Sequence, residues 1–142
     1  MQILVLYQSR SGHTRQAAEA ISAAARNLGH SVATKSVIEV RQADVEQAEL
    51  LFVGTWIQGF ILFGVKPAGA DLWVPALPSL AGKPVAMFCT YAFNPRRAMD
   101  RLSDLLKARG ATVVGQNTIH RSRPGDGAED FVRQTLSALS PT

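Results

Sequence analysis

A run of five apolar residues followed by a turn rich in hydroxyl groups most constrains how this chain folds. Residues 3–7 read Ile-Leu-Val-Leu-Tyr, and the next seven, Gln-Ser-Arg-Ser-Gly-His-Thr, lead into an alanine-rich stretch with helical spacing. An unbroken apolar run is typical of a strand that is buried on both faces of a parallel sheet. A helix that starts directly after such a strand presents backbone N–H groups and the positive end of its dipole. The segment therefore predicts an anion site between the strand and the helix.

Three other phosphate-binding turns do not fit this segment. A P-loop needs the pattern Gly-x4-Gly-Lys-Ser/Thr, and no lysine follows Gly12. The dinucleotide fingerprint needs three spaced glycines, whereas this turn has one. A thiol phosphatase loop would place a cysteine at the end of the strand, and the single cysteine is Cys89. The remaining alternative to a ligand site is an ordinary capped turn between a strand and a helix.

Further apolar runs alternate with helical patterns along the whole chain. We expect strands at residues 31–40, 50–54, 84–89 and 111–119, and helices over residues 17–28, 98–106 and 131–139. Residues 41–49 are too few for more than a turn or two of helix. Prolines within residues 55–83 leave at most a short helix, around residues 70–77. This order predicts a single α/β domain over residues 1–142. Its architecture is a three-layer, doubly wound, five-stranded parallel sheet of order 2-1-3-4-5.

The composition is typical of a soluble globular protein. Of the 142 residues, 46% are hydrophobic and 18% are charged, and the longest apolar runs are too short for a membrane helix. No signal peptide is recognised and there is one cysteine, so we expect a cytoplasmic protein without an internal disulfide. Three scattered histidines offer no metal-ligand spacing. The net charge is +4, but the sequence has no dense stripe of basic residues such as a nucleic-acid-binding protein carries.

Three loops at the expected carboxyl ends of strands resemble those of one family. The pattern Ser-x-Ser-Gly-x-Thr at residues 9–14 resembles the phosphate loop of flavodoxins, and Gly-Thr-Trp at residues 54–56 resembles their flavin-stacking loop. Residues 89–95, Cys-Thr-Tyr-Ala-Phe-Asn-Pro, resemble the loop that holds the other side of the flavin ring. The resemblance covers nearly the whole chain and implies a flavoprotein that binds FMN and takes part in electron transport.

The resemblance also implies which residues hold the cofactor, and it implies no catalytic side chain. The FMN phosphate would be held by Ser9, Arg10, Ser11, Gly12, His13 and Thr14, and the flavin ring by Thr55, Trp56, Ile57 and Gly59 on one side and Thr90, Tyr91 and Ala92 on the other.

Several of these residues have a second interpretation. Trp56 could fold over the core, and Phe93 could replace Tyr91 as the second aromatic ring. Arg10 could point to solvent, and His13, near a positive helix end, is expected to be an N–H donor or a bystander. Cys89 is interpreted as a small apolar residue and not as a redox thiol.

The sequence departs from the electron-carrying flavodoxins in two respects. Those proteins are acidic around the flavin, whereas this chain has an isoelectric point near 9.7 and an apolar segment, Phe-Ile-Leu-Phe-Gly-Val, at residues 60–65. This segment could be core, a homodimer interface or the wall of a substrate site. Carriers commonly have Gly or Asn after the stacking aromatic, because that peptide flips to stabilise the semiquinone. Here Ile57 is β-branched, which opposes a conformation with positive φ.

We therefore expect an FMN-binding oxidoreductase that takes electrons from a nicotinamide or a reductase. A small quinone-like acceptor is favoured by the basic charge, by Ile57 and by the apolar segment. A one-electron carrier with a protein acceptor is favoured by the small size of the chain. A third alternative is an interaction module that keeps the fold without the flavin.

Overall fold

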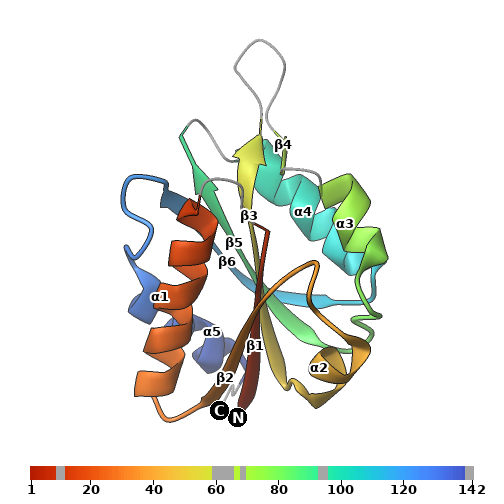
Figure 1. The fold of residues 1–142 in the computed structure, drawn as a ribbon, viewed down its shortest axis with the longest axis horizontal. Coiled ribbons are helices and arrows are strands. Elements are labelled where there is room, and N and C mark those ends of the chain that lie inside the picture. The colour runs from red at the N-terminus through yellow and green to blue at the C-terminus, as the bar shows by residue number, and fades with distance from the viewer. Residues whose placement is uncertain (9–11, 59–65, 68–69, 93–95, 140–142) are drawn as a thin grey trace.

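A parallel sheet with helices on both faces forms the molecule (Figure 1). The computed structural model describes residues 1–8, 12–58, 66–67, 70–92 and 96–139. The strands are β1 (Gln2–Tyr7), β2 (Ser31–Ser36), β3 (Leu50–Gln58), β4 (Lys66–Pro67), β5 (Pro84–Tyr91) and β6 (Thr112–His120). The helices are α1 (His13–Asn27), α2 (Gln42–Gln47), α3 (Ala70–Ala76), α4 (Arg96–Ala108) and α5 (Ala128–Leu139).

The five longer strands pair in parallel in the order β2-β1-β3-β5-β6. β4 is a two-residue strand that pairs antiparallel with β3 and is not one of these five. Counted without β4, the order is 2-1-3-4-5, so the expected strand order is confirmed. β1 and β3 are neighbours although they are separated by β2 in the sequence. The strand order therefore reverses between β1 and β3, the position where ligands bind in open sheets of this type.

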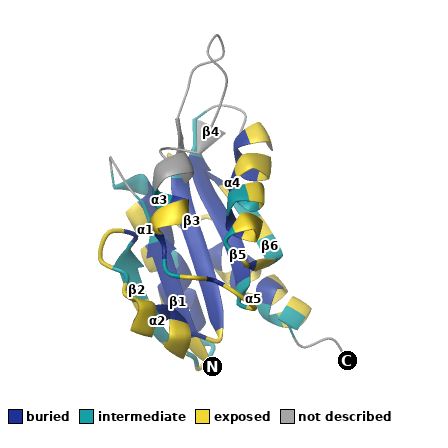
Figure 2. Cartoon of the chain, turned by 90° about the vertical axis from the view of Figure 1, so that its right-hand side faces the viewer, coloured by how far each residue is buried: buried dark blue, intermediate teal, exposed yellow. Residues whose placement is uncertain are grey.

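Each strand in the middle of the sheet contributes to two separate cores. In β1, Ile3 and Val5 pack with α1 and α5, whereas Leu4 and Leu6 pack on the opposite face with residues of α2, α3 and α4. Alternate side chains point to opposite faces, so a strand covered on both faces must be apolar at every position. Figure 2 shows the buried strands between helices whose outer sides are exposed.

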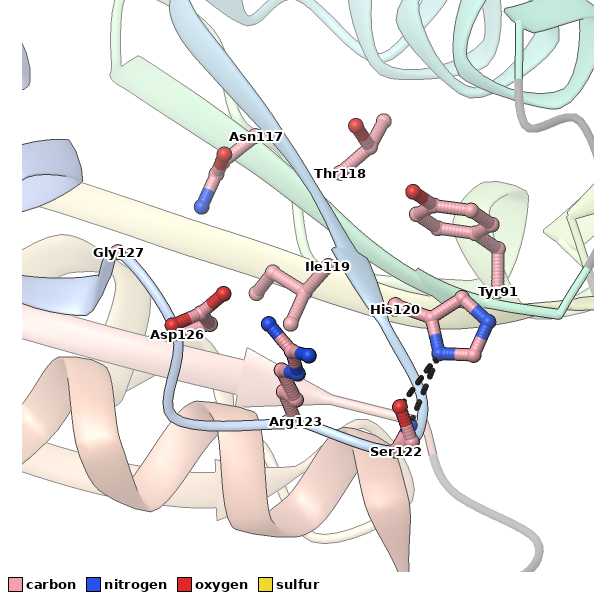
Figure 3. Close-up of a pocket in the computed structure, with 9 residues that line it drawn as sticks. All are labelled: Tyr91, Asn117, Thr118, Ile119, His120, Ser122, Arg123, Asp126 and Gly127. Atoms are coloured by element: carbon pink, nitrogen blue, oxygen red, sulfur yellow. Dashed lines mark hydrogen bonds between the residues drawn. The ribbon is translucent and has the colours of Figure 1, made fainter.

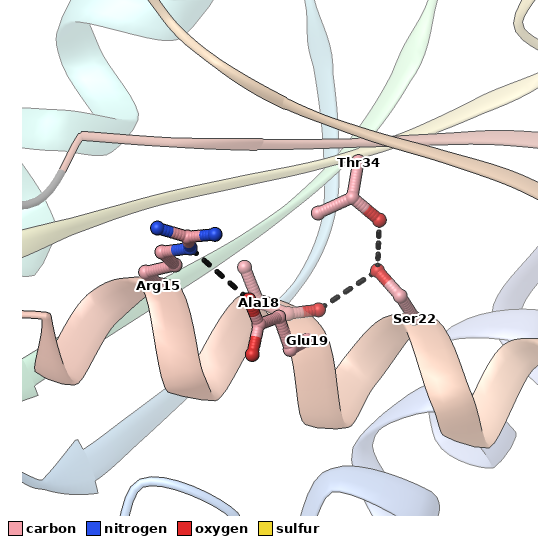
Figure 4. Close-up of polar contacts among 5 residues, drawn as sticks. All are labelled: Arg15, Ala18, Glu19, Ser22 and Thr34. Atoms are coloured by element: carbon pink, nitrogen blue, oxygen red, sulfur yellow. Dashed lines mark hydrogen bonds and ion pairs between the residues drawn. The ribbon is translucent and has the colours of Figure 1, made fainter.

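Small residues let α1 lie close to the sheet. Its inner face carries Ala17, Ala18, Ala24 and Ala25, all buried. One polar residue of this face, Ser22, is also buried, and its hydroxyl lies 2.8 Å from the carbonyl of Ala18 and 2.6 Å from the hydroxyl of Thr34 in β2 (Figure 4). These contacts satisfy the buried hydroxyl group and tie α1 to the edge of the sheet.

Two strand ends differ by four residues from the expected ones, and β5 runs two residues further than expected, to Tyr91. β2 ends at Ser36 instead of continuing to residue 40, because the chain turns there and Val37 donates to the carbonyl of Tyr7 over 2.9 Å. β3 continues to Gln58 instead of ending at residue 54, because β4 supplies an antiparallel partner for its last two residues. Trp56 and Ile57 thus belong to a strand and not to a loop.

Gly54 leaves the space that the ring of Phe88 occupies on the neighbouring strand β5. A Cβ atom at Gly54 would overlap that ring, whereas a Cβ atom at Gly115 in β6 would meet Thr135 Oγ1 at 3.2 Å. We expect Gly54→Ala to lower the free energy of unfolding by about 1–3 kcal/mol, the usual cost of overfilling a packed core. Gly115→Ala is the matched control, with a smaller loss in urea denaturation. Equal losses for the two variants would contradict the close approach of Phe88.

Candidate functional site

The carboxyl ends of β1, β3 and β5 meet at one edge of the sheet, next to the start of α1 (Figure 1). The N–H of Gln8, directly after β1, donates to the carbonyl of Gly54 over 2.9 Å. Thr55 is fully buried, and its hydroxyl donates to Gln8 Oε1 over 3.0 Å. One strand further, Trp56 stands opposite Thr90 in the parallel register of β3 and β5. Residues more than thirty positions apart in the sequence thus surround one edge.

The first helix starts at this edge in a geometry suited to an anion. Gly12 is the N-cap of α1 and has φ of 92°, a left-handed conformation that glycine adopts without strain. The N–H groups of the first turn have no carbonyl partner within the helix. His13 is the first helical residue and is half-buried. Ser9, Arg10 and Ser11 lie outside the described residues.

A pair of buried hydroxyl groups joins the start of α1 to the end of β5. Thr14 and Thr90 are 1% and 2% exposed, and their Oγ1 atoms are 2.8 Å apart. If Thr90 donates, the Thr14 hydroxyl keeps its own proton for a ligand at the helix start. The two expected subsites, for the phosphate and for the ring, are therefore in direct contact through these side chains.

Two half-buried aromatic residues lie near the carboxyl ends of the strands that border this edge. Trp56 lies in β3, and Tyr91 is the last residue of β5, followed by half-buried Ala92. Tyr91 makes an edge-to-face contact with His120, with 5.4 Å between the ring centroids and an angle of 78° between the planes. Gly59, Phe93 and residues 60–65 lie outside the described residues.

Sequence reasoning missed the residues at the end of β6 and in the segment that follows it. Beside Tyr91 the structure has a pocket of about 510 Å³, shown in Figure 3. Its other lining residues are Asn117, Thr118, Ile119, His120, Ser122, Arg123, Asp126 and Gly127. The loop rich in Gly, Pro and Arg after the last strand was the available signal, because it follows the carboxyl end of a parallel strand like the three loops that we considered.

Cys89 lies under this edge and cannot serve as a reactive thiol. Its strand lies between β3 and β6, its side chain is fully buried in the core under α3 and α4, and burial raises the pKa of the thiol to about 12. A thiol with this pKa stays protonated at neutral pH, whereas the thiolate is the reactive form. This finding supports the interpretation of Cys89 as a small apolar residue.

The described part of the edge fits FMN. A helix start with a left-handed glycine suits a phosphate group, and the hydroxyl of Thr14 adds a donor. Two aromatic residues at neighbouring strand ends suit the faces of a flat ring. Among the described residues, no three His, Cys, Asp or Glu side chains are placed to hold a metal ion. In the same part of the chain no helix has the length and apolar character needed to cross a bilayer.

Comparison with known proteins gives the same result as the geometry. The sequence model of the flavodoxin family matches residues 5–134 of the chain. A flavodoxin of Megasphaera elsdenii is 28% identical over 114 residues, which are 78% of this chain and 80% of that protein.

Solved structures match over nearly the whole length. The solution structure of two-electron reduced Megasphaera elsdenii flavodoxin has a TM-score of 0.79 at 21% identity, covering 97% of this chain and 99% of that one. The Streptococcus pneumonia TIGR4 flavodoxin has a TM-score of 0.74 at 17% identity, covering 96% and 99%. At these identities the structures show the fold, while the family match covers most of the sequence. The chain belongs to the flavodoxin family, and its cofactor is FMN.

Proposed function

We propose that this protein is an FMN-dependent oxidoreductase that passes electrons from a nicotinamide or a reductase to a small quinone-like acceptor. Flavodoxins transfer electrons to redox partners through bound FMN. The flavin supplies the redox chemistry, and the residues of the chain bind it, orient it and control access to it. The start of α1, with Gly12 and Thr14, would hold the phosphate, and Trp56 and Tyr91 would lie against the ring.

The observation that carries this proposal is the backbone conformation after Trp56. Ile57 and Gln58 are paired with Pro67 and Lys66 in the antiparallel ladder of β3 and β4. In the carriers that the sequence resembles, the peptide at this position flips when the flavin is reduced. A β-branched residue resists the required positive φ, and pairing with β4 adds a second restraint. The ladder therefore supports transfer of electrons in pairs, which takes a quinone to the hydroquinone in one step.

The carrier function is the second candidate, favoured by a specific observation. The flavodoxin of Megasphaera elsdenii aligns over 80% of its own length, and its structure over 99%. We rank it second on energetic grounds. In the carriers, the flipped peptide offers its carbonyl to the N5–H of the reduced flavin, and such a bond contributes on the order of 1–3 kcal/mol. Positive φ at a β-branched residue costs about 1–3 kcal/mol. The two terms nearly cancel, so the flip gains little.

Stepwise anaerobic reduction of the FMN-loaded protein tests the proposal. We expect the visible absorbance of the wild-type protein to fall in a single two-electron stage. Ile57→Gly removes the β-branch and should split the titration into two stages, whereas Ile57→Val keeps the β-branch and should behave like the wild type. Turnover should be faster with 1,4-benzoquinone than with the one-electron acceptor cytochrome c. Two well-separated stages in the wild-type protein would return the carrier function to first place.

A further inference from the structure

The pocket beside Tyr91 shares only that residue with the three loops that the family resemblance assigns to FMN. It lies between the end of β6, the segment 120–127 and the start of α5, and its volume is about 510 Å³ (Figure 3). This volume is within the usual range for sites of small organic ligands. Tyr91 belongs both to this pocket and to the expected ring subsite, so the two sites share a wall.

One side of the pocket is aromatic. Tyr91 and His120 are in edge-to-face contact, and Ile119, which is 2% exposed, lies between them and the polar side (Figure 3). The ring of His120 is fixed by Ser122, whose N–H donates to Nδ1 over 3.2 Å and whose Oγ lies 2.7 Å from the same atom. Two rings held in place offer a flat ligand an ordered aromatic surface.

The polar side carries a guanidinium group that has no structural task. Arg123 lines the pocket, and in the part of the chain that the structure describes its side chain makes no hydrogen bond or ion pair. Other cations of the described residues do have such tasks: Arg26, Lys83 and Arg109 donate to backbone carbonyls, and Arg15, Lys35 and Arg133 form ion pairs. Arg123 is thus available to a ligand.

A carboxylate limits the charge that the pocket can accept. Asp126 lines the same pocket, and no ion pair between it and Arg123 is present among the described residues (Figure 3). One guanidinium group can bind a single anionic group through charge-assisted hydrogen bonds. The nearby carboxylate opposes a second negative charge on the ligand. The combination favours a monoanion over a dianion.

We propose that this pocket binds a planar aromatic molecule that carries one anionic substituent, with the ring against Tyr91 and His120 and the anion on Arg123. That the occupant is the electron acceptor rests on the function proposed above. Such an acceptor, a quinone with one sulfonate or carboxylate group, would gain two electrons and two protons from the reduced flavin and leave as the hydroquinone. The binding site itself does not depend on that role.

Calorimetric titration with two redox-inactive probes tests the site. Naphthalene-2-sulfonate and naphthalene-2-sulfonamide have the same ring and nearly the same shape but differ in charge. We expect the FMN-loaded protein to bind the sulfonate about tenfold more tightly, as for one charge-assisted contact. Arg123→Gln should remove this preference, and Asp126→Asn should increase it by roughly twofold to fivefold. Lys107→Gln, which removes an exposed charge at the end of α4, is the control and should leave it unchanged.

Three results would overturn the proposal. They are equal binding of the two probes by the wild-type protein, the same loss in Lys107→Gln as in Arg123→Gln, and displacement of FMN by the sulfonate, which would make the pocket a part of the flavin site. Binding of the sulfonate by a protein that takes up no FMN would support the pocket and refute the proposed function. Competitive inhibition of the reduction of 1,4-naphthoquinone-2-sulfonate by the inactive sulfonate supports the acceptor role, and its absence would refute that role.

Discussion

Thr14→Val is expected to weaken FMN binding by about 1.5–3 kcal/mol, the contribution of one hydrogen bond to a charged group, and to change riboflavin binding little. Thr14 lies in the first turn of α1, where the helix dipole and the backbone N–H groups favour an anion. Its hydroxyl is buried and contacts Thr90 over 2.8 Å, so its position is fixed before a ligand arrives. Riboflavin lacks the phosphate, and it therefore cannot lose this interaction. Titrations that follow the quenching of flavin fluorescence measure both affinities.

Two further valine variants distinguish the loss of the phosphate contact from a general loss of flavin binding. Thr90→Val removes the partner that orients the Thr14 hydroxyl, and we expect a smaller loss that is again specific for FMN. Thr34→Val also removes a hydroxyl group that pairs with another, but its partner is Ser22, two turns along α1 from the expected phosphate subsite. It should leave the ratio of the two affinities unchanged. Equal losses for FMN and riboflavin in Thr14→Val would refute the phosphate assignment.

The strand order could be predicted because the central strands are apolar at every position. Ile3, Leu4, Val5 and Leu6 divide between two cores, and only a strand covered on both faces needs such a sequence. With helical patterns between the strands, right-handed crossovers leave few arrangements. The same reasoning placed Gly12, Thr55 and Thr90 at one edge, since parallel strands end on the same side.

The contacts that build the site could not be predicted from periodicity. The hydroxyl pair of Thr14 and Thr90 joins residues 76 positions apart, and its distance depends on the exact depth at which α1 packs on the sheet. The extension of β3 through Ile57 depends on β4, a two-residue strand with too few residues to show a pattern. The pocket at Arg123 arises because the register of β5 and β6 places Tyr91 opposite His120. These features follow from tertiary packing, which local sequence patterns do not determine.

Trp56→Ala is expected to weaken FMN binding by about 1–3 kcal/mol, through lost apolar burial and lost stacking. Because Trp56 belongs to β3 and is half-buried, the variant should also unfold more easily without FMN, unlike a change in an exposed loop. Trp56→Phe keeps an aromatic face and should recover much of the affinity. Chemical denaturation of the apoprotein and titration with FMN separate the two effects.

Trp73 provides the comparison that decides between a flavin contact and a core residue. It is also half-buried, lies in α3 and packs against the core on one face of the sheet. Trp73→Ala should therefore lower the stability of the apoprotein and leave the affinity for FMN nearly unchanged. If Trp56→Ala gave this same pattern, Trp56 would be a core residue. A loss of affinity that exceeds the loss in Trp73→Ala, and that Trp56→Phe largely restores, requires an aromatic face against the flavin ring, since both alanine variants remove the same indole group from a half-buried position.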